Sequence, residues 1–298
     1  MKGGHLPMDE ARITALHVYP VKSCRGIALD SAIIGEAGIT GDRRWMIATP
    51  EGRFVTQREL PALAMIATEQ LPEGLRLTAP DGSCLTVSYL IDGERRRVRV
   101  WNDDCLAFDA GESASAWLHA KLGQPLRLCQ FDPSTTRPSD PIWADGIRSL
   151  NEFSDGFPIL VACEASLADL NARLLVPIPM NRFRPNLVLG GIAAWDEDRL
   201  HEIAIGALRI RILKPCTRCR TTTIDQSTGE PQGTEPLATL KASRWSDELK
   251  GVLFGQNAAV GAGAGTRIAV GDRVSLSWRT RTDSNRRPPG SKPGALSN

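Results

Sequence analysis

One short stretch of the chain places two cysteines among basic side chains. It reads Lys214-Pro215-Cys216-Thr217-Arg218-Cys219-Arg220-Thr221-Thr222-Thr223-Ile224-Asp225. The β-branched run at its end, 221–224, predicts a strand, which would put both cysteines on the loop that enters it. A guanidinium group beside a thiol favours the thiolate, because positive charge stabilises the anion. Since a thiolate ligates soft metals or attacks electrophiles, the stretch predicts a site for a metal ion, an anionic ligand, or both.

Three other interpretations of the cysteine pair remain open. A structural zinc site needs a second pair of ligands, whereas the remaining cysteines are scattered singly, at Cys24, Cys84, Cys105, Cys129 and Cys163. A thioredoxin-like redox pair lies between a strand and a helix, whereas here a strand is expected to follow. Two ordinary buried cysteines would need a dry environment, which the neighbouring Lys214, Arg218 and Arg220 oppose.

Composition narrows the class of protein. With 298 residues, of which 42% are hydrophobic, the chain suits one large domain or two intimate ones. We expect no membrane association, because no apolar run is long enough to span a bilayer and residues 1–10 lack the apolar core of a signal peptide. The odd number of cysteines, 7 in all, indicates a reducing compartment and therefore a cytoplasmic protein.

Charge is distributed unevenly along the chain. The formal net charge is +2, but residues 279–298 carry five basic side chains against one acidic one, which leaves the rest of the chain at −2. A mildly acidic body has no electrostatic footprint for nucleic acid, so we expect no nucleic-acid partner. The last segment is rich in Pro, Gly, Ser and Arg and has no periodicity, which predicts a disordered basic tail over 279–298.

Short strand-like segments punctuated by turns dominate the rest of the chain. Strands are predicted at 13–19, 27–34, 45–48, 75–78, 84–89, 95–101, 159–162 and 187–189, with a final strand pair at 267–278. Helices are predicted at 113–122, 166–174 and 235–243. The segment 132–143, rich in Pro, Ser, Thr and Asp, reads as a connection between two halves. We therefore expect an α+β, predominantly β fold with barrel-like domains at 11–130 and 131–278 and peripheral helices.

A series of motifs resembles, in the same order, the MOSC domain family, named after the C-terminal domain of molybdenum cofactor sulfurase, together with its N-terminal β-barrel domain. The cysteine stretch carries the resemblance together with Tyr19-Pro20-Val21-Lys22-Ser23-Cys24-Arg25-Gly26, Asp155-Gly156-Phe157-Pro158, Glu164-Ala165-Ser166-Leu167, Phe183-Arg184-Pro185-Asn186 and Phe254-Gly255-Gln256-Asn257. The resemblance covers about residues 11–278 and is greatest to bacterial relatives of the mitochondrial amidoxime-reducing component.

The resemblance implies a molybdenum ion held by the dithiolene of a phosphate-bearing pterin, with Cys219 as the metal ligand and catalytic residue. The residues that would hold this molybdopterin are Lys22, Ser23, Arg43, Asp155, Gly156, Arg184, Asn186, Thr217, Arg218 and Asn257. Pyridoxal phosphate binding is also associated with the family. Thr217 stands where a serine is common, Gly156 and Phe157 replace hydroxyl residues, and Asn257 replaces an aromatic one, so contacts at Gly156 and Phe157 would have to come from the backbone.

The activity implied is reduction of N-hydroxylated compounds, namely N-oxygenated bases, hydroxylamines and amidoximes, with the N–O oxygen leaving as water. The chain ends without the iron–sulfur domain that some bacterial relatives append, so we expect electrons from a separate flavin or iron–sulfur protein. Both Arg43 and Arg184 are expected to hold the cofactor without contributing to folding. Two alternatives stay open: a carrier that hands the cofactor on without turnover, and a sulfur carrier with a persulfide on Cys219.

Overall fold

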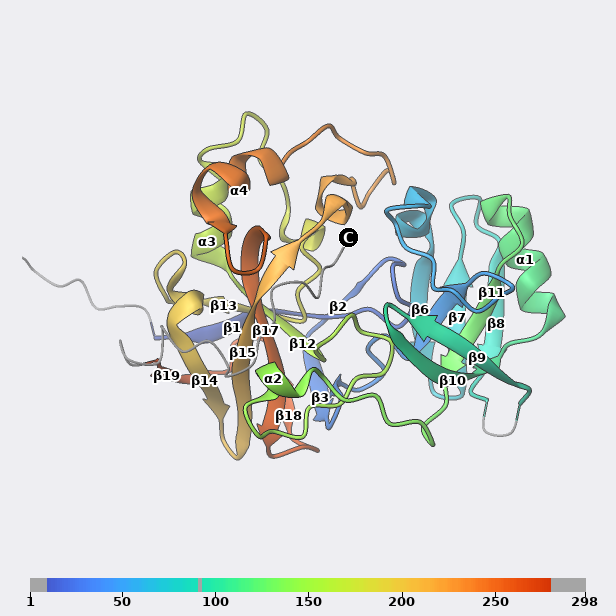
Figure 1. Cartoon of the computed structure of the whole chain (residues 1–298), viewed down its shortest axis with the longest axis horizontal. Helices are drawn as coiled ribbons and strands as arrows, with labels where there is room; N and C mark the ends of the chain where they lie inside the picture. Colours follow the sequence, from blue (N-terminus) through green and yellow to red (C-terminus); the bar gives the residue numbers. More distant parts are fainter. Residues whose placement is uncertain (1–9, 91–92, 280–298) are drawn as a thin grey trace, which may run out of the picture.

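The computed structural model describes residues 10–90 and 93–279, and the predicted disordered tail lies almost entirely outside these ranges. Figure 1 shows two bodies side by side, one built mostly from residues before 131 and the other mostly from residues after it. The predicted predominantly β, α+β fold is confirmed. Strand pairing arranges the described strands in open sheets, which curve around separate cores.

A nine-stranded sheet forms the larger body, in the order β19-β14-β15-β17-β12-β13-β1-β2 with β16 paired to β17. Its strands are β1 (Arg12–Val18), β2 (Ile27–Leu29), β12 (Ile159–Cys163), β13 (Leu187–Gly190), β14 (Leu200–Ile205), β15 (Leu208–Arg218), β16 (Trp245–Ser246), β17 (Gly251–Ala262) and β19 (Ser275–Trp278). β12 and β13 run parallel, whereas β1 and β2 continue the sheet in antiparallel order. Apolar side chains from these strands, such as Val161 and Ile210, are fully buried in one core.

The smaller sheets complete the two bodies. One contains β5 (Trp45–Ala48), β11 (Arg127–Phe131), β10 (Asp103–Asp109) and β9 (Arg95–Val100). A second contains β6 (Ala67–Leu71), β7 (Gly74–Thr78) and β8 (Cys84–Ser88), and a third contains β18 (Arg267–Ala269), β3 (Ser31–Gly35) and β4 (Gly38–Ile39). The strands predicted at 75–78 and 84–89 are confirmed as β7 and β8. They pair antiparallel as a hairpin, and Gly82 in the turn between them has a φ of 83°.

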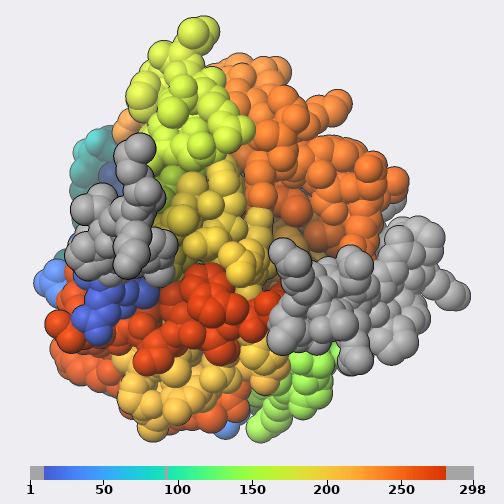
Figure 2. Space-filling view, turned by 90° about the vertical axis from the view of Figure 1, so that its left-hand side faces the viewer, coloured from blue at the N-terminus to red at the C-terminus, as the bar shows by residue number. Residues whose placement is uncertain are grey.

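Helices cover the sheets rather than forming layers of their own. They are α1 (Glu112–Leu122), α2 (Pro141–Ala144), α3 (Glu164–Asn171) and α4 (Leu237–Arg244), with the 3₁₀ turns η1 (Pro61–Met65), η2 (Met180–Arg182), η3 (Asp196–Arg199) and η4 (Arg220–Thr223). In the part of the chain described, none of these helices has the length and apolar character needed to cross a bilayer. Figure 2 shows the end of the molecule where α3 (yellow-green) and α4 (orange) lie close together, and both contribute side chains to one small core with Phe183 and Phe254.

The expected strand over 221–224 is wrong, because this segment forms η4 instead. The hydroxyl of Thr222 donates to the Cys219 carbonyl at 3.0 Å, and that of Thr223 donates to the Arg220 carbonyl at 2.9 Å. Such local bonds compete with a strand ladder and tighten the backbone into a turn. Cys216 therefore lies near the end of β15 and Cys219 directly follows this strand, so neither is on a loop that enters a strand. Because a 3₁₀ turn and not a strand follows the cysteines, the expected strand no longer counts against a redox pair.

Asn257, a predicted cofactor contact, lies inside the long strand β17. The sheet pairing also corrects one expectation from sequence. The segment 267–278 is not a hairpin, because β18 pairs with β3 whereas β19 pairs with β14. The connection between them bonds to the start of β1 instead, as Gly271 N donates to Ile13 O at 2.8 Å.

Residues 12–39, which include β1 to β4, pack with strands from the C-terminal half of the chain. β1 pairs with β13, and β3 pairs with β18, so strands from the N-terminal segment complete sheets of the C-terminal half. The domain boundary expected near residue 130 stays a prediction. In the folded protein, the body that contains the C-terminal half of the sequence also includes β1 to β4.

Candidate functional site

A buried tyrosine lies between two arginines where the bodies meet. The guanidinium carbons of Arg43 and Arg184 lie 4.3 Å and 4.2 Å from the centre of the Tyr19 ring. Burial raises the pKa of Tyr19 to about 12, so its phenol is neutral and donates to Pro185 O at 3.1 Å. Arg43 and Arg184 have φ values of 49° and 56°, a region that non-glycine residues rarely occupy and that often marks a functional site.

Arg43 and Arg184 differ in how many hydrogen-bond partners their guanidinium groups have. Arg43 donates to the buried carboxylate of Asp42, to Asn186 Oδ1 at 3.0 Å and to Arg184 O at 3.4 Å. Arg184 Nη1 makes one long bond, 3.5 Å, to Gln226 Oε1, while its buried Nη2 has no partner in the described part of the protein. Burial lowers the pKa of Arg184 to about 10, so it still carries its charge at neutral pH. A charged, partly unsatisfied guanidinium is a ready donor to an anion.

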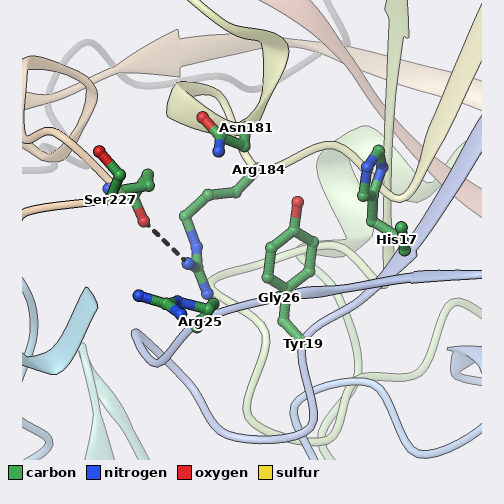
Figure 3. Close-up of a pocket in the computed structure, with 9 residues that line it drawn as sticks. His17, Tyr19, Arg25, Gly26, Asn181, Arg184 and Ser227 are labelled. Carbon is green, nitrogen blue, oxygen red and sulfur yellow. Dashed lines mark hydrogen bonds between the residues drawn. The ribbon is translucent and has the colours of Figure 1, made fainter. Parts of the chain in front are cut away.

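Arg184 reaches into a cavity of about 500 Å³. The lining residues are His17, Tyr19, Arg25, Gly26, Ala28, Asn181, Arg184, Gln226 and Ser227. Figure 3 shows the guanidinium of Arg184 between the Ser227 loop and Arg25, with the Tyr19 ring beside it. The cavity therefore joins two cationic side chains with uncharged hydrogen-bonding groups, which suits a polar anionic ligand.

Asn186, predicted to hold the cofactor, is used inside the protein. Its Oδ1 accepts from Leu160 N at 3.1 Å and from Arg43, and its Nδ2 donates to His17 O at 3.2 Å. The residue is 1% exposed. Asn186 thus ties β12, β1 and the Arg43 loop together, which positions the two arginines.

Lys22 and Asp155, which lie 133 positions apart in the sequence, form an ion pair. Lys22 Nζ lies 2.6 Å from Asp155 Oδ1 and donates to Phe153 O at 2.8 Å. Burial lowers the pKa of Lys22, and the Asp155 charge opposes that shift. Desolvation would raise the pKa of Asp155, but the Lys22 ammonium and its hydrogen bond hold it below the usual range. The Asp155 carboxylate is therefore charged at neutral pH.

The loops beside this ion pair leave space for a ligand. Ser23 has a φ of 70°, and its carbonyl accepts from Gln57 Nε2 at 2.7 Å. A Cβ placed on Gly156 would meet no atom of the described residues within 4 Å, so that backbone faces open space. Contacts at Gly156 would have to come from its backbone, as the sequence predicts.

The two cysteines of the motif lie in different environments. Cys216 is half-buried within β15, and Arg218 Nη1 lies 2.8 Å from its sulfur. Cys219 follows the end of β15 and is exposed, 3.5 Å from Thr221 Oγ1. Arg218 also donates to Phe183 O at 2.7 Å, and its buried Nε has no partner among the described residues. Cys219 is thus the accessible thiol.

Thr217 and Asn257, the remaining predicted site residues, lie on paired strands. Thr217 of β15 is opposite Leu253, and Asn257 of β17 is opposite Lys214 and Leu160. Asn257 therefore lies several residues along the ladder from the end of β15 where Cys219 is found. Its role as a cofactor contact stays a prediction.

Sequence reasoning missed a tryptophan and an arginine beside these groups. Trp101 Nε1 donates to Asp155 Oδ1 at 2.9 Å, and the guanidinium carbon of Arg58 lies 4.6 Å from the Trp101 ring centre. Alternation predicts Trp101 as the end of the strand 95–101, although a Trp-Asn pair between two alternating segments is also a turn signal. The strand β9 ends at Val100.

Comparison with known proteins defines the class. Residues 10–125 match the MOSC N-terminal beta barrel domain, and residues 149–275 match the MOSC domain. The chain is 34% identical over 279 residues to mitochondrial amidoxime-reducing component 1 of Homo sapiens, covering 89% of this chain and 82% of that protein. It is 32% identical to mitochondrial amidoxime reducing component 2 of Bos taurus, covering 81% and 75% of the two chains. The protein belongs to the MOSC family that includes the mitochondrial amidoxime-reducing components.

Proposed function

We propose that this protein is a molybdenum-cofactor-dependent reductase of N-hydroxylated compounds that takes electrons from a separate flavin or iron–sulfur protein. The relatives are named amidoxime-reducing components, and both of their MOSC segments are present in this chain. The observation that carries the proposal is a pair of buried guanidinium nitrogens without a partner among the described residues. One belongs to Arg184, which lines the cavity, and the other to Arg218, which directly precedes Cys219 in the sequence.

The residues present fit a phosphate-bearing pterin with a soft metal. Buried donors without acceptors cost free energy, roughly 1–3 kcal/mol each, which a bound phosphate or pterin oxygen would offset. Guanidinium groups match such oxygens in a planar, often bidentate way. The exposed Cys219 thiol offers a soft ligand. When bound, the molybdenum cofactor supplies the two-electron redox chemistry.

Residues of the chain would bind the cofactor and hold it in position. Arg184 and Arg218 would hold anionic and polar parts of the cofactor, and Cys219 would ligate the metal. Arg43 and Asn186 would keep Arg184 in position through their bonds to neighbouring loops. The net reaction takes up two electrons and two protons, cleaves the N–O bond and releases the reduced nitrogen compound and water.

We also propose that the protein is located in a reducing compartment, the cytoplasm. All seven cysteines are free in the structure. Unpaired thiols of this number are typical of cytoplasmic proteins. A cytoplasmic location would also keep Cys219 available as a thiolate ligand.

The test is to produce the protein in a host that synthesises the cofactor, assay bound molybdenum and pterin, and measure reduction of benzamidoxime by a chemical electron donor. Cys219→Ala should abolish activity and metal–thiolate absorption, whereas Cys216→Ala should keep part of both. Complete loss in both variants would support a paired-thiol site instead. Bound molybdenum without turnover would favour a cofactor carrier, and a persulfide on Cys219 without molybdenum would favour a sulfur carrier.

A further inference from the structure

The turn between β9 and β10 holds its tryptophan in a costly conformation. Val100 pairs with Asp103, so Trp101 and Asn102 form a two-residue turn. Trp101 has a φ of 57°, and Asn102 is not among the residues with positive φ. A two-residue hairpin with positive φ only at its first central position strongly favours glycine there. A bulky side chain in that position is a backbone outlier, and such strain tends to persist where it serves a function.

Contacts from two segments far apart in the sequence fix the Trp101 ring. The ring packs 5.0 Å from Phe54, and its indole nitrogen donates to Asp155, the partner of Lys22. The buried side chain of Arg137 binds both neighbouring segments, through Asp103 Oδ2 at 2.9 Å and Asp155 O at 2.7 Å. The tip of the β9–β10 hairpin is therefore attached to the 152–155 loop and cannot swing freely.

Arg58 connects this ring to the cysteine loop. Its guanidinium lies over the Trp101 ring, and its Nε is 3.4 Å from Thr56 Oγ1. Its carbonyl accepts a hydrogen bond from the side chain of Arg220, the residue next to Cys219. Arg58 is therefore placed between Trp101 on one side and the accessible thiol loop on the other.

We infer that Arg58, held over the Trp101 ring, is a specificity-determining platform for the substrate. This inference rests on the proposed function, because it concerns the N-hydroxylated compound reduced beside Cys219. A guanidinium plane stacks on conjugated groups and carries a fixed positive charge, and the exposed Arg220 adds a second one. The platform selects planar, conjugated N-hydroxylated compounds that are neutral or anionic, and it disfavours cationic ones such as N-hydroxyguanidines.

The experiment compares kcat/KM for three compounds of similar size on the cofactor-loaded enzyme. They are benzamidoxime, a carboxylate-bearing benzamidoxime and an aromatic N-hydroxyguanidine. The wild type should prefer the first two. In Arg58→Gln, the ratio of kcat/KM for the anionic to the cationic compound should fall about fivefold, as expected when one partly exposed charge near the substrate is removed. Arg97→Gln, which removes the same charge from an exposed position on β9, is the control and should leave the ratio unchanged.

A second variant tests the tryptophan without endangering the fold. Trp101→Gly places the residue that this turn favours, so the protein should fold and bind molybdenum normally. Because Arg58 loses its support, the selectivity ratio should fall as in Arg58→Gln. The inference would be overturned if the ratio of kcat/KM stayed unchanged in both variants. It would also be overturned if Arg97→Gln lowered this ratio as much as they do, because the effect would then not depend on the position of Arg58. Loss of molybdenum in Trp101→Gly would also overturn it, since the ring would then serve the cofactor. A wild type that reduces none of the three compounds would instead defeat the proposed function.

Discussion

Arg43 and Arg184 both lie beside the Tyr19 ring, but their hydrogen-bond partners give them different roles. Arg43 neutralises Asp42, whose side chain is 1% exposed, and bonds to Asn186. Arg184 has one long bond and a buried nitrogen without a partner in the described protein. We therefore revise the expectation that neither arginine contributes to folding. Removing Arg43 would leave the buried carboxylate of Asp42 without its partner.

We predict that alanine variants of these arginines separate folding from cofactor binding. In cofactor-free protein, Arg43→Ala should lower the free energy of unfolding by roughly 3–5 kcal/mol, as is usual when one partner of a buried ion pair is removed. Arg184→Ala should leave it nearly unchanged but lower the molybdenum content of loaded protein. Urea unfolding and metal analysis measure the two effects. Equal losses of stability in both variants would show that Arg184 is also structural.

At the scale of elements, the bend in β17 is what places the cysteine strand. Gly255 has a φ of 75°, and β15 pairs with β17 through register shifts on either side of Lys214 and Pro215. A Cβ on Gly255 would lie 2.7 Å from Val161 O of the neighbouring strand. The residue before it, Phe254, stacks on Phe183 at 3.7 Å between ring centres. The Phe-Gly-Gln-Asn motif is thus largely a packing device that brings β15 and the Phe183 loop together.

Gly255→Ala should therefore destabilise the protein by more than its conformation alone requires. An alanine in the left-handed region costs roughly 1–2 kcal/mol, and the clash with Val161 O adds to that. Gly82→Ala is a matched control, because Gly82 has a φ of 83° but a Cβ there would meet no atom of the described residues within 4 Å. Thermal unfolding of both variants should show the larger drop for Gly255→Ala. Similar drops would mean that the strands shift apart at little cost.

At the scale of the whole molecule, the N-terminal segment belongs to the C-terminal half. Ile13, Leu16 and Val18 of β1 are buried in the same core as the strands β12 to β17. Their removal would expose apolar surface on β13 and leave its hydrogen-bonding edge unpaired. The candidate site depends on the same joint, because Tyr19 and Lys22 follow directly after β1.

We predict that residues 131–279 alone do not unfold cooperatively, because the core lacks its β1 side chains. Adding a peptide of residues 10–40 should restore a cooperative melt by circular dichroism, whereas a scrambled peptide of the same composition should not. A cooperative transition of the isolated fragment at the full-length melting temperature would show that the β1 pairing adds little.

Several secondary-structure elements of this protein, and its family, could be predicted from the sequence. Strand-like segments predicted β7, β8 and β9, and the helix α1 was expected to within one residue. These features depend on side chains that are close together in the chain, so a local pattern determines them. The family resemblance, carried by motifs in a fixed order, is likewise a property of the sequence and was confirmed.

Tertiary structure decided what the chain could not specify locally. The threonines after Cys219 favour a strand by propensity, yet their hydroxyls bond back to the preceding carbonyls and form η4. The partners of Arg43, Arg184 and Lys22 come from segments more than 100 residues away, apart from Asp42 and Gln226. The Trp101–Arg58 stack joins a turn to a loop 43 positions earlier in the sequence. Which charge is neutralised and which is left for a ligand depends on these long-range contacts, and no local pattern encodes them.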